Sequence, residues 1–278
     1  MTVRPVEREK MITQPAVSIR GVSKTYATRE GPVFAIDDIS LDMDYGDFVA
    51  ILGPSGCGKS TLMLMVAGLV RHSGGTISIN GNPIKEPCTE LGIVFQDAVL
   101  LDWRNVIDNL MLQAEIRRLD RTSLRARGME LLAQVGLEGF EHRNPWELSG
   151  GMRQRVSLCR ALVHDPPLLL MDEPFGALDA LTREQLNLDL QGIWLSRRKT
   201  VMFITHSISE AVFLANRVIV MSPRPGRIVA QIDVELPRPR HPRVRETGEF
   251  SYYVHKIRTL FEDLGVLRGQ RGVYANSA

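Results

Sequence analysis

Apolar residues along the chain fall into short runs that predict β-strands. Residues 17–20 and 34–43 alternate between apolar and polar side chains, which is typical of strands buried on one face. The same alternation returns at residues 76–80 and 227–236. Nearly continuous apolar runs, which predict buried strands, occupy residues 48–52, 91–95, 168–171, 201–204 and 217–221.

A helical spacing of apolar residues separates these runs. It appears at residues 62–70, directly after a glycine-rich loop, and again at residues 252–264. Residues 106–119 and 123–135 carry it as well. We therefore predict an all-helical insert, from about residue 98 to about residue 160, between strands of one core. Strands joined by helices indicate an α/β fold with a covered parallel sheet.

The chain divides into three segments by composition. Residues 1–15 are polar and charged, which predicts a flexible tail. Residues 16–236 carry most of the predicted strands and helices and form the predicted main domain. Residues 237–278 begin with the basic, proline-broken stretch PRPRHPRVR and continue into an amphipathic helix. We interpret the basic stretch as a solvated, stiff connector, with contact to acidic lipid headgroups as the alternative.

Composition narrows the classes of protein to which the chain can belong. Its 278 residues are 44% hydrophobic, which is enough for one large domain or two packed lobes. Lys and Arg total 34 against 32 for Asp and Glu, so the net charge of +2 creates no global field for nucleic acid. Three unpatterned cysteines indicate reduced thiols. No apolar run approaches the roughly 20 residues that span a bilayer, and the first residues lack the apolar centre of a signal peptide.

The most informative stretch is the glycine-rich sequence GPSGCGKST, which lies between a predicted strand and a predicted helix. Glycines let successive backbone N–H groups point at one position, and the helix adds the positive end of its dipole. Lys59 can then reach the outer phosphates of a nucleotide, and Ser60 can bind Mg²⁺. An ordinary turn would explain the glycines but not the Lys–Ser pair. We therefore predict a site for ATP or GTP at Gly53, Pro54, Ser55, Gly56, Cys57, Gly58, Lys59, Ser60 and Thr61.

Two adjacent acids follow the apolar run 168–171. The carboxyl end of a buried strand in an open α/β sheet faces the ligand crevice. Asp172 is therefore predicted to belong to the Mg²⁺ shell, and Glu173 to polarise the attacking water. Two acids that cap the turn before Pro174 are the alternative. The phosphate loop upstream favours the catalytic interpretation.

A second glycine pair occurs in the stretch LSGGMRQR, residues 148–155. Ser149 is typical of a helix N-cap, and Gly150 and Gly151 leave the first backbone N–H groups of the helix open to a ligand. The stretch predicts a second anion site that has no lysine of its own. Taken alone, it is also compatible with an ordinary capped helix.

LSGGMRQR resembles the signature sequence of ATP-binding cassette (ABC) proteins, and the phosphate loop and LLLMDEP resemble the two nucleotide motifs of that family. Their order and approximate spacing agree over nearly the whole chain. The resemblance implies an α/β fold: a phosphate-loop core with a mixed β-sheet, an antiparallel β-subdomain and an all-helical insert. It also implies ATP and Mg²⁺ as cofactors and ATP hydrolysis as the activity. Met152 stands where the family most often has glutamine, and we expect a small effect because Ser149 and backbone amides supply the anion contacts.

Four further residues match family positions. The resemblance implies that Tyr26 stacks on adenine, and a buried tyrosine at a strand end is the alternative. Gln96 matches the glutamine that contacts Mg²⁺ or the attacking water and moves with the insert, although a polar turn residue is the alternative. Asp179 matches the residue that links the two sites across a dimer, and an N-cap aspartate explains it almost as well. His206 matches the switch histidine that bonds the γ-phosphate, whereas a lone histidine is usually surface or core.

The resemblance also implies how the two anion sites cooperate. If the insert separates Ser149 from the phosphate loop of its own chain, as it does in relatives, two chains placed head to tail complete each other's sites. Each signature then closes over the ATP of the other chain, and hydrolysis lets the homodimer open. By resemblance, this cycle drives transmembrane permease subunits at the cytoplasmic face of the inner membrane and indirectly serves a solute-binding protein. It involves no nucleic acid.

Three stretches resemble the ATPase subunits of importers for nitrate, sulfonate, taurine and related solutes: DWRNVIDNL, PFGALDALTRE and SPRPGRIVAQIDVELPRPR. In similar importers the region of Trp103 docks a short helix of the membrane subunit, and Trp103 is either an anchor there or core of the insert. These residues need not encode the substrate, because the substrate does not touch this subunit. An ABC exporter, an ABC ATPase acting on nucleic acid or ribosomes, and a kinase or GTPase outside the family are the alternatives.

Overall fold

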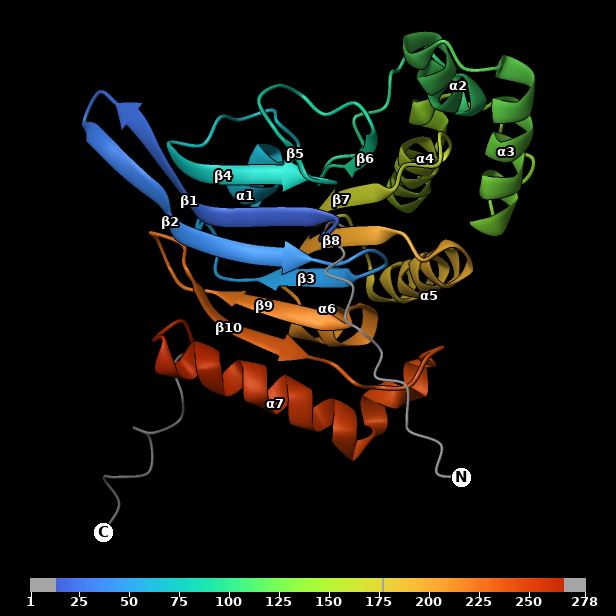
Figure 1. Ribbon diagram of the computed structural model, residues 1–278. Helices are drawn as coiled ribbons and strands as arrows, with labels where there is room; N and C mark the ends of the chain where they lie inside the picture. Colours follow the sequence, from blue (N-terminus) through green and yellow to red (C-terminus); the bar gives the residue numbers. More distant parts are fainter. Residues whose placement is uncertain (1–13, 177, 268–278) are drawn as a thin grey trace, which may run out of the picture.

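Two β-sheets form the centre of the protein, with helices packed around them (Figure 1). The computed structural model describes residues 14–176 and 178–267. The larger sheet has six strands in the order β10-β9-β3-β8-β7-β6, and the smaller has four in the order β2-β1-β4-β5. The strands of the larger sheet are β3 (Phe48–Leu52), β6 (Leu91–Val94), β7 (Leu168–Asp172), β8 (Thr200–Thr205), β9 (Arg217–Met221) and β10 (Ile228–Asp233). Those of the smaller sheet are β1 (Val17–Thr28), β2 (Gly31–Met43), β4 (Gly74–Ile79) and β5 (Asn82–Pro83).

The helices occupy the stretches between these strands and the end of the described chain. They are α1 (Lys59–Val66), α2 (Val106–Arg117), α3 (Arg121–Gln134), α4 (Gly150–Leu162), α5 (Ala180–Arg197), α6 (Ile208–Leu214) and α7 (Gly248–Asp263). Two short 3₁₀ segments, Pro145–Glu147 and Pro242–Glu246, precede α4 and α7.

The larger sheet is mixed and is covered on both faces. β3 pairs in parallel with β8 and β9, and β7 pairs in parallel with β8 and β6, whereas β10 runs antiparallel to β9. Along β3, Phe48, Ala50 and Leu52 enter one core cluster, while Val49 and Ile51 enter the other. Because neither face meets water, every position of this strand is apolar, which explains the continuous runs in the sequence.

The remaining strands form the antiparallel part of the fold. β1 pairs antiparallel with both β2 and β4, and β4 pairs antiparallel with β5. The apolar side chains of this sheet pack with α1 in the second core cluster. The predicted α/β fold class, with a mixed sheet, an antiparallel β-subdomain and a helical insert, is confirmed.

Helices α2, α3 and α4 lie between β6 and β7 in the chain, and α2 and α3 form the green end of the molecule in Figure 1, with α4 in olive next to them. α2 begins after Asn105 and α3 after Asp120, and each of these side chains accepts a hydrogen bond from a backbone N–H of the first turn. Arg118, in the left-handed conformation at φ 56°, ends α2. The division into residues 1–15, 16–236 and 237–278 stays a prediction, since residues 1–13 and 268–278 lie outside the described residues.

The basic stretch 237–245 is solvated only in part: Pro237, Pro239, His241 and Arg243 are exposed, whereas Arg240 is buried, so the prediction of a solvated connector is wrong for Arg240. Arg240 is only 2% exposed. Its guanidinium donates hydrogen bonds to the carbonyl oxygens of Val212, Phe213 and Ala215 at the end of α6. The last carbonyls of a helix have no partner within the helix, and a cation there also complements the helix dipole. The stretch is therefore fastened to the core, and α7 then runs alongside β10 (Figure 1).

Candidate functional site

The glycine-rich loop connects β3 to α1 and takes a backbone path that favours glycine at two positions. Gly56 has φ 75° and Gly58 has φ 101°, and both lie in the left-handed region. A Cβ atom on Gly58 would lie 2.9 Å from the carbonyl oxygen of Ala35. Gly58 is also the N-cap of α1, and its carbonyl accepts the N–H of Leu62 at 2.8 Å. The helix therefore starts at Lys59, and its positive end faces the loop.

Lys59 is a buried cation at the centre of this loop. It is 5% exposed, and its Nζ donates hydrogen bonds to the carbonyl oxygens of Gly53 at 2.9 Å and Pro54 at 3.2 Å. The same nitrogen lies 3.9 Å from Oε1 of Glu173. The predicted loop lysine and the predicted strand-end acid thus share one site. The ammonium is positioned there to bind an anion.

Asp172 ends β7 beside the phosphate loop. Burial raises the pKa of the Asp172 carboxyl, and the negative charge of Glu173 raises it further. The Ser60 hydroxyl and the Lys59 charge act in the opposite direction, because both lie close enough to stabilise the carboxylate. A hydroxyl and a half-buried carboxylate are hard oxygen donors, so Ser60 and Asp172 fit the predicted Mg²⁺.

Glu173 adopts a strained backbone conformation where β7 ends. Its φ is 44°, which is uncommon for a residue other than glycine, and its N–H donates to the carbonyl oxygen of Ile204 on β8 at 2.9 Å. Its Oε2 lies 3.2 Å from Nδ1 of His206, which directly follows β8. The ends of two adjacent parallel strands thus bring the predicted catalytic acid and the predicted switch histidine together.

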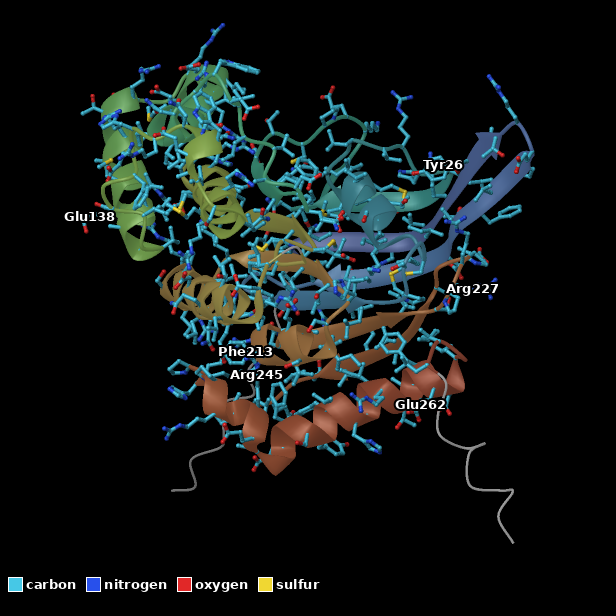
Figure 2. The ribbon with its side chains drawn as sticks, turned by 180° about the vertical axis from the view of Figure 1, so that it is seen from behind. Tyr26, Glu138, Phe213, Arg227, Arg245 and Glu262 are labelled. Carbon is cyan, nitrogen blue, oxygen red and sulfur yellow. The ribbon has the colours of Figure 1, made fainter. Side chains whose placement is uncertain are left out.

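Tyr26 lies near the end of β1 (Figure 2). Its hydroxyl is 3.5 Å from Oγ1 of Thr61, and the Lys24 ammonium lies 4.7 Å from the centre of its ring. The side chain is 38% exposed, so the alternative of a buried tyrosine is wrong. An accessible ring beside the phosphate loop agrees with the prediction that Tyr26 stacks on adenine, which stays a prediction.

Gln96 is exposed and follows β6, the neighbour of β7 in the sheet. The carbonyl oxygen of Phe95 accepts a 3.2 Å hydrogen bond from Nε2 of Gln154 on α4. This segment therefore connects the strand beside Asp172 with a helix of the insert. The predicted role of Gln96 at the metal or the attacking water stays a prediction.

Ser149 and Asp179 lie together at the starts of α4 and α5. Ser149 Oγ accepts the N–H of Met152 at 3.3 Å, and Asp179 Oδ1 accepts the N–H of Thr182 at 3.0 Å. A Cβ on Gly151 would lie 2.6 Å from Cγ2 of Thr182, so a larger residue there would force Thr182 to shift. Ser149 and Asp179 are exposed N-caps, and no hydrogen bond or ion pair between described residues joins either side chain to the phosphate loop.

The segment 223–227 supports the phosphate loop and was not predicted from the sequence. Arg224 Nε donates a 3.2 Å hydrogen bond to the carbonyl oxygen of Gly56. A Cβ on Gly226 would lie 2.0 Å from the carbonyl oxygen of Cys57, so the two segments pack backbone to backbone. Cys57 itself is buried, which raises the pKa of its thiol.

Trp103 projects from the insert instead of filling its core, so that alternative is wrong. The side chain is 78% exposed. The loop that carries it is held by the fully buried Asn109, whose Oδ1 accepts the N–H of Leu101 at 2.8 Å and whose Nδ2 donates to the carbonyl oxygens of Leu101 and Arg104. A rigid loop therefore presents a large aromatic side chain at the surface.

A phosphate loop at the end of β3, an acid pair at the end of β7 and a histidine at the end of β8 define a phosphate-loop nucleotide-binding protein. Comparison with known proteins gives the family. The family model described as "ABC transporter" matches residues 36–176, half of the chain.

Similar proteins include a taurine import ATP-binding protein, TauB, of Rhizobium johnstonii, which is 50% identical over 81% of this chain and 84% of the relative. An uncharacterized ABC transporter ATP-binding protein of Methanocaldococcus jannaschii is 40% identical over 89% of this chain and 91% of the relative. The solved dimeric structure of MJ0796, a bacterial ABC transporter cassette, matches with a TM-score of 0.71 and 29% identity, covering 80% of this chain and 100% of that one. A post-hydrolysis structure of the same cassette, bound to ADP and Pi, matches with a TM-score of 0.70.

The chain belongs to the ABC transporter family, and it is an ATP-binding ATPase of that family. This confirms the resemblance read from the signature and the two nucleotide motifs. Within the part of the chain that the structure describes, no helix combines the length and the apolar character that crossing a membrane needs.

Proposed function

We propose that the chain is the ATP-hydrolysing subunit of an importer for taurine or a related small solute such as a sulfonate or nitrate. Support for this solute class comes from the relatives named taurine import ATP-binding proteins, which are 50% identical in Rhizobium johnstonii and 46% identical in Burkholderia pseudomallei. The stretches around Trp103, Asp179 and residues 222–240 point to the same group. An exporter would share the same fold and chemistry and differ in its membrane partner.

The working unit in this proposal is a head-to-tail homodimer with two ATP molecules at its interface. The observation that carries it is the placement of Ser149. Its helix N-terminus is exposed and suited to an anion, yet no hydrogen bond or ion pair between described residues connects it to the phosphate loop of its own chain. A second chain supplies the missing half of each site, with Asp179 beside it at the interface.

Within each site the residues have separate tasks. Lys59 and the loop amides hold the phosphates, and Tyr26 supports the adenine. Ser60, Asp172 and Gln96 would hold Mg²⁺, which would neutralise negative charge on the nucleotide phosphates. Glu173 accepts a hydrogen bond from the attacking water, and His206 contacts the γ-phosphate. Loss of the γ-phosphate removes that contact and allows the dimer to open.

The membrane partner is a permease at the cytoplasmic face of the inner membrane, which receives solute from a binding protein. Trp103 is the proposed anchor for a short helix of that permease, because an exposed tryptophan on a rigid loop buries a large area at little entropic cost. Gln96 and the Phe95–Gln154 contact then relate the nucleotide site to the insert that carries the anchor.

The decisive experiment uses Glu173→Gln, which retains the shape of the site and removes the group that polarises water. At saturating MgATP we expect this variant to accumulate as a dimer in sedimentation velocity, since closure is no longer followed by hydrolysis. The matched control is Glu138→Gln, changed at an exposed acid of the insert (Figure 2), which should hydrolyse ATP normally and form no stable dimer. A strictly monomeric Glu173→Gln variant would refute the shared site.

The solute is tested separately in cells that lack this chain. Uptake of labelled taurine should return with the wild-type chain and stay absent with Glu173→Gln. If the chain restores uptake of another anion but not of taurine, the transported solute is that anion and the taurine assignment is wrong.

A further inference from the structure

Glu210 is a buried carboxylate that the chemistry described so far does not use. It lies in the first turn of α6 and is 6% exposed. Its Oε2 accepts a 2.7 Å hydrogen bond from the hydroxyl of Thr205. That hydroxyl oxygen accepts the N–H of Ser207 at 3.0 Å, and Ser207 Oγ accepts the N–H of Glu210 at 3.3 Å. These bonds fix the two residues that flank His206.

The other oxygen of the same carboxylate faces α5. Oε1 of Glu210 lies 3.6 Å from Nε of Arg183, in the first turn of that helix. Arg183 also donates a 2.8 Å hydrogen bond from Nη2 to the carbonyl oxygen of Leu178, directly before Asp179. The backbone N–H of Arg183 bonds the carbonyl of Asp179 at 3.0 Å. One ion pair therefore connects the segment of His206 with the segment of Asp179.

Burial makes this arrangement costly. Burial raises the pKa of the Glu210 carboxyl, while the Thr205 hydrogen bond and the Arg183 charge lower it. A buried ion pair adds little stability compared with well-packed apolar side chains, whereas losing one partner leaves an uncompensated charge. The pair is thus better explained by the geometry that it imposes on the two loops than by its contribution to stability.

We propose that Glu210 and Arg183 are positioning residues that hold the His206 and Asp179 segments as one rigid unit. The inference rests on the head-to-tail dimer proposed above. In that dimer His206 contacts the γ-phosphate of its own site, and Asp179 reaches the site shared with the partner. Because the two segments are rigidly connected, the His206 contact and the Asp179 contact form together. ATP bound in one site therefore also positions the residues of the other site.

The test compares two variants of the pair with a neighbouring control. Glu210→Gln keeps the size of the side chain and an acceptor for Thr205 but removes the charge facing Arg183. Arg183→Met removes that charge from the other side. Glu184→Gln is the control, since Glu184 directly follows Arg183 on α5 and has a 2.9 Å ion pair with Arg245 instead of one with Glu210.

We expect kcat for ATP hydrolysis to fall roughly ten- to hundredfold in both variants of the pair, because a small misplacement of reacting groups has effects of that size. The KM for ATP should change by less than about threefold, because neither side chain is a predicted ligand of the nucleotide. The double variant should lose no more than the worse single variant, as expected for two residues that act as one unit. Glu184→Gln should keep wild-type kinetics.

Thr205→Val keeps the test valid if a charge variant fails to fold, since it removes only the hydroxyl that joins Glu210 to Ser207. It should lower kcat in the same direction without lowering the melting temperature below the assay range. Unchanged kcat in folded Glu210→Gln and Thr205→Val would overturn the inference, as would additive losses in the double variant or an equal loss in Glu184→Gln. Failure of the dimer itself is seen independently, as a monomeric Glu173→Gln variant with wild-type Glu210 and Arg183.

Discussion

The chemistry of single residues in this site depends on charges buried side by side. The Lys59 ammonium lies between two loop carbonyls and the Glu173 carboxylate, and a buried ammonium is stable only among such acceptors. The phosphate loop predicted Lys59 and the acid pair after the run 168–171 predicted Glu173, because both motifs are defined by local spacing. Local spacing could not predict the left-handed backbone of Glu173, whose N–H donates a hydrogen bond to Ile204 on the neighbouring strand.

Replacing Lys59 by alanine removes the buried ammonium that donates to the loop carbonyls of Gly53 and Pro54. We expect the affinity for MgATP to fall about hundredfold, which is the effect of losing charge-assisted hydrogen bonds to phosphate. Fluorescent-nucleotide titration measures it. Lys256→Ala, at an exposed position of α7, is the matched control and should bind as the wild type does. Unchanged affinity in Lys59→Ala would contradict the assigned site.

At the scale of elements, ion pairs connect the helical insert with the core, and the sequence did not predict them. Asp165 follows α4, and its Oδ1 lies 2.8 Å from Arg127 on α3 and 2.7 Å from Lys199 before β8. The hydrogen bond with Arg127 holds the pKa of the Asp165 carboxyl well below its usual range. These three residues are far apart in sequence, so no local pattern could pair them.

His164 makes this connection sensitive to pH. Burial, with Arg117 and Arg127 nearby, lowers the pKa of its imidazole to about 4, whereas Leu91 and Asp165 act in the opposite direction. The unfolded chain takes up the proton near the ordinary histidine pKa, so the folded state loses stability as pH falls from about 6.5 towards 4.

The size of this loss follows from the His164 pKa shift, reduced because the ring is only partly buried. We expect about 2 kcal/mol between pH 7 and pH 4. In His164→Leu that part of the pH dependence should disappear from urea unfolding curves, whereas His142→Leu, at an exposed position of the insert, should keep it. Parallel stability profiles for His164→Leu and the wild type would contradict this assignment.

Arg240 makes the second contact of this kind between elements, because its guanidinium donates hydrogen bonds to the carbonyl oxygens at the end of α6. Arg240→Met keeps an apolar stem but leaves the carbonyls of Val212, Phe213 and Ala215 without this donor. We expect the free energy of unfolding to fall by about 3 kcal/mol, as for loss of buried charge-assisted hydrogen bonds. Urea unfolding measures the effect, with the exposed Arg243→Met as control. Equal stability of the two variants would show that Arg240 is not a fastening point.

Arg245, at the end of the basic stretch, also contacts α6. The Arg245 guanidinium lies 4.7 Å from the ring of Phe213 on α6, and both side chains lie beside α7 in Figure 2. Charged residues in a proline-broken stretch usually indicate a solvated segment, and nothing local distinguished these arginines from solvated ones. Only their burial against α6 in the folded chain reveals the difference.

For the whole molecule, the features that depend on local residue spacing were predicted from the sequence, whereas contacts between distant segments were missed. The strands around β3 and the helical insert were predicted because their apolar patterns reflect burial on known faces. Helix α1 was predicted at 62–70 but runs from Lys59 to Val66, since Gly58 starts it and the left-handed Gly68 follows its end. The brace from Arg224 to the phosphate loop joins segments separated by most of the chain, so it was missed.

A site shared between two chains predicts that ATPase activity depends on chain concentration, which is not expected of a chain that acts alone. If Ser149 serves the ATP of a partner, the specific ATPase activity of the wild type should rise with chain concentration to a plateau. Ser149→Arg places a bulky side chain at the exposed N-terminus of α4 and should lower that plateau about tenfold or more, because it disturbs the groups aimed at the phosphates.

The same variant should leave nucleotide binding by the single chain unchanged, since Lys59 and its loop are intact. Ser251→Arg, at an exposed position in the first turn of α7, is the control and should follow the wild-type curve. Steady-state turnover across a dilution series, with nucleotide titration at the lowest concentration, separates the two effects. Specific activity that is independent of concentration, and equal in all three proteins, would show that each chain hydrolyses ATP by itself.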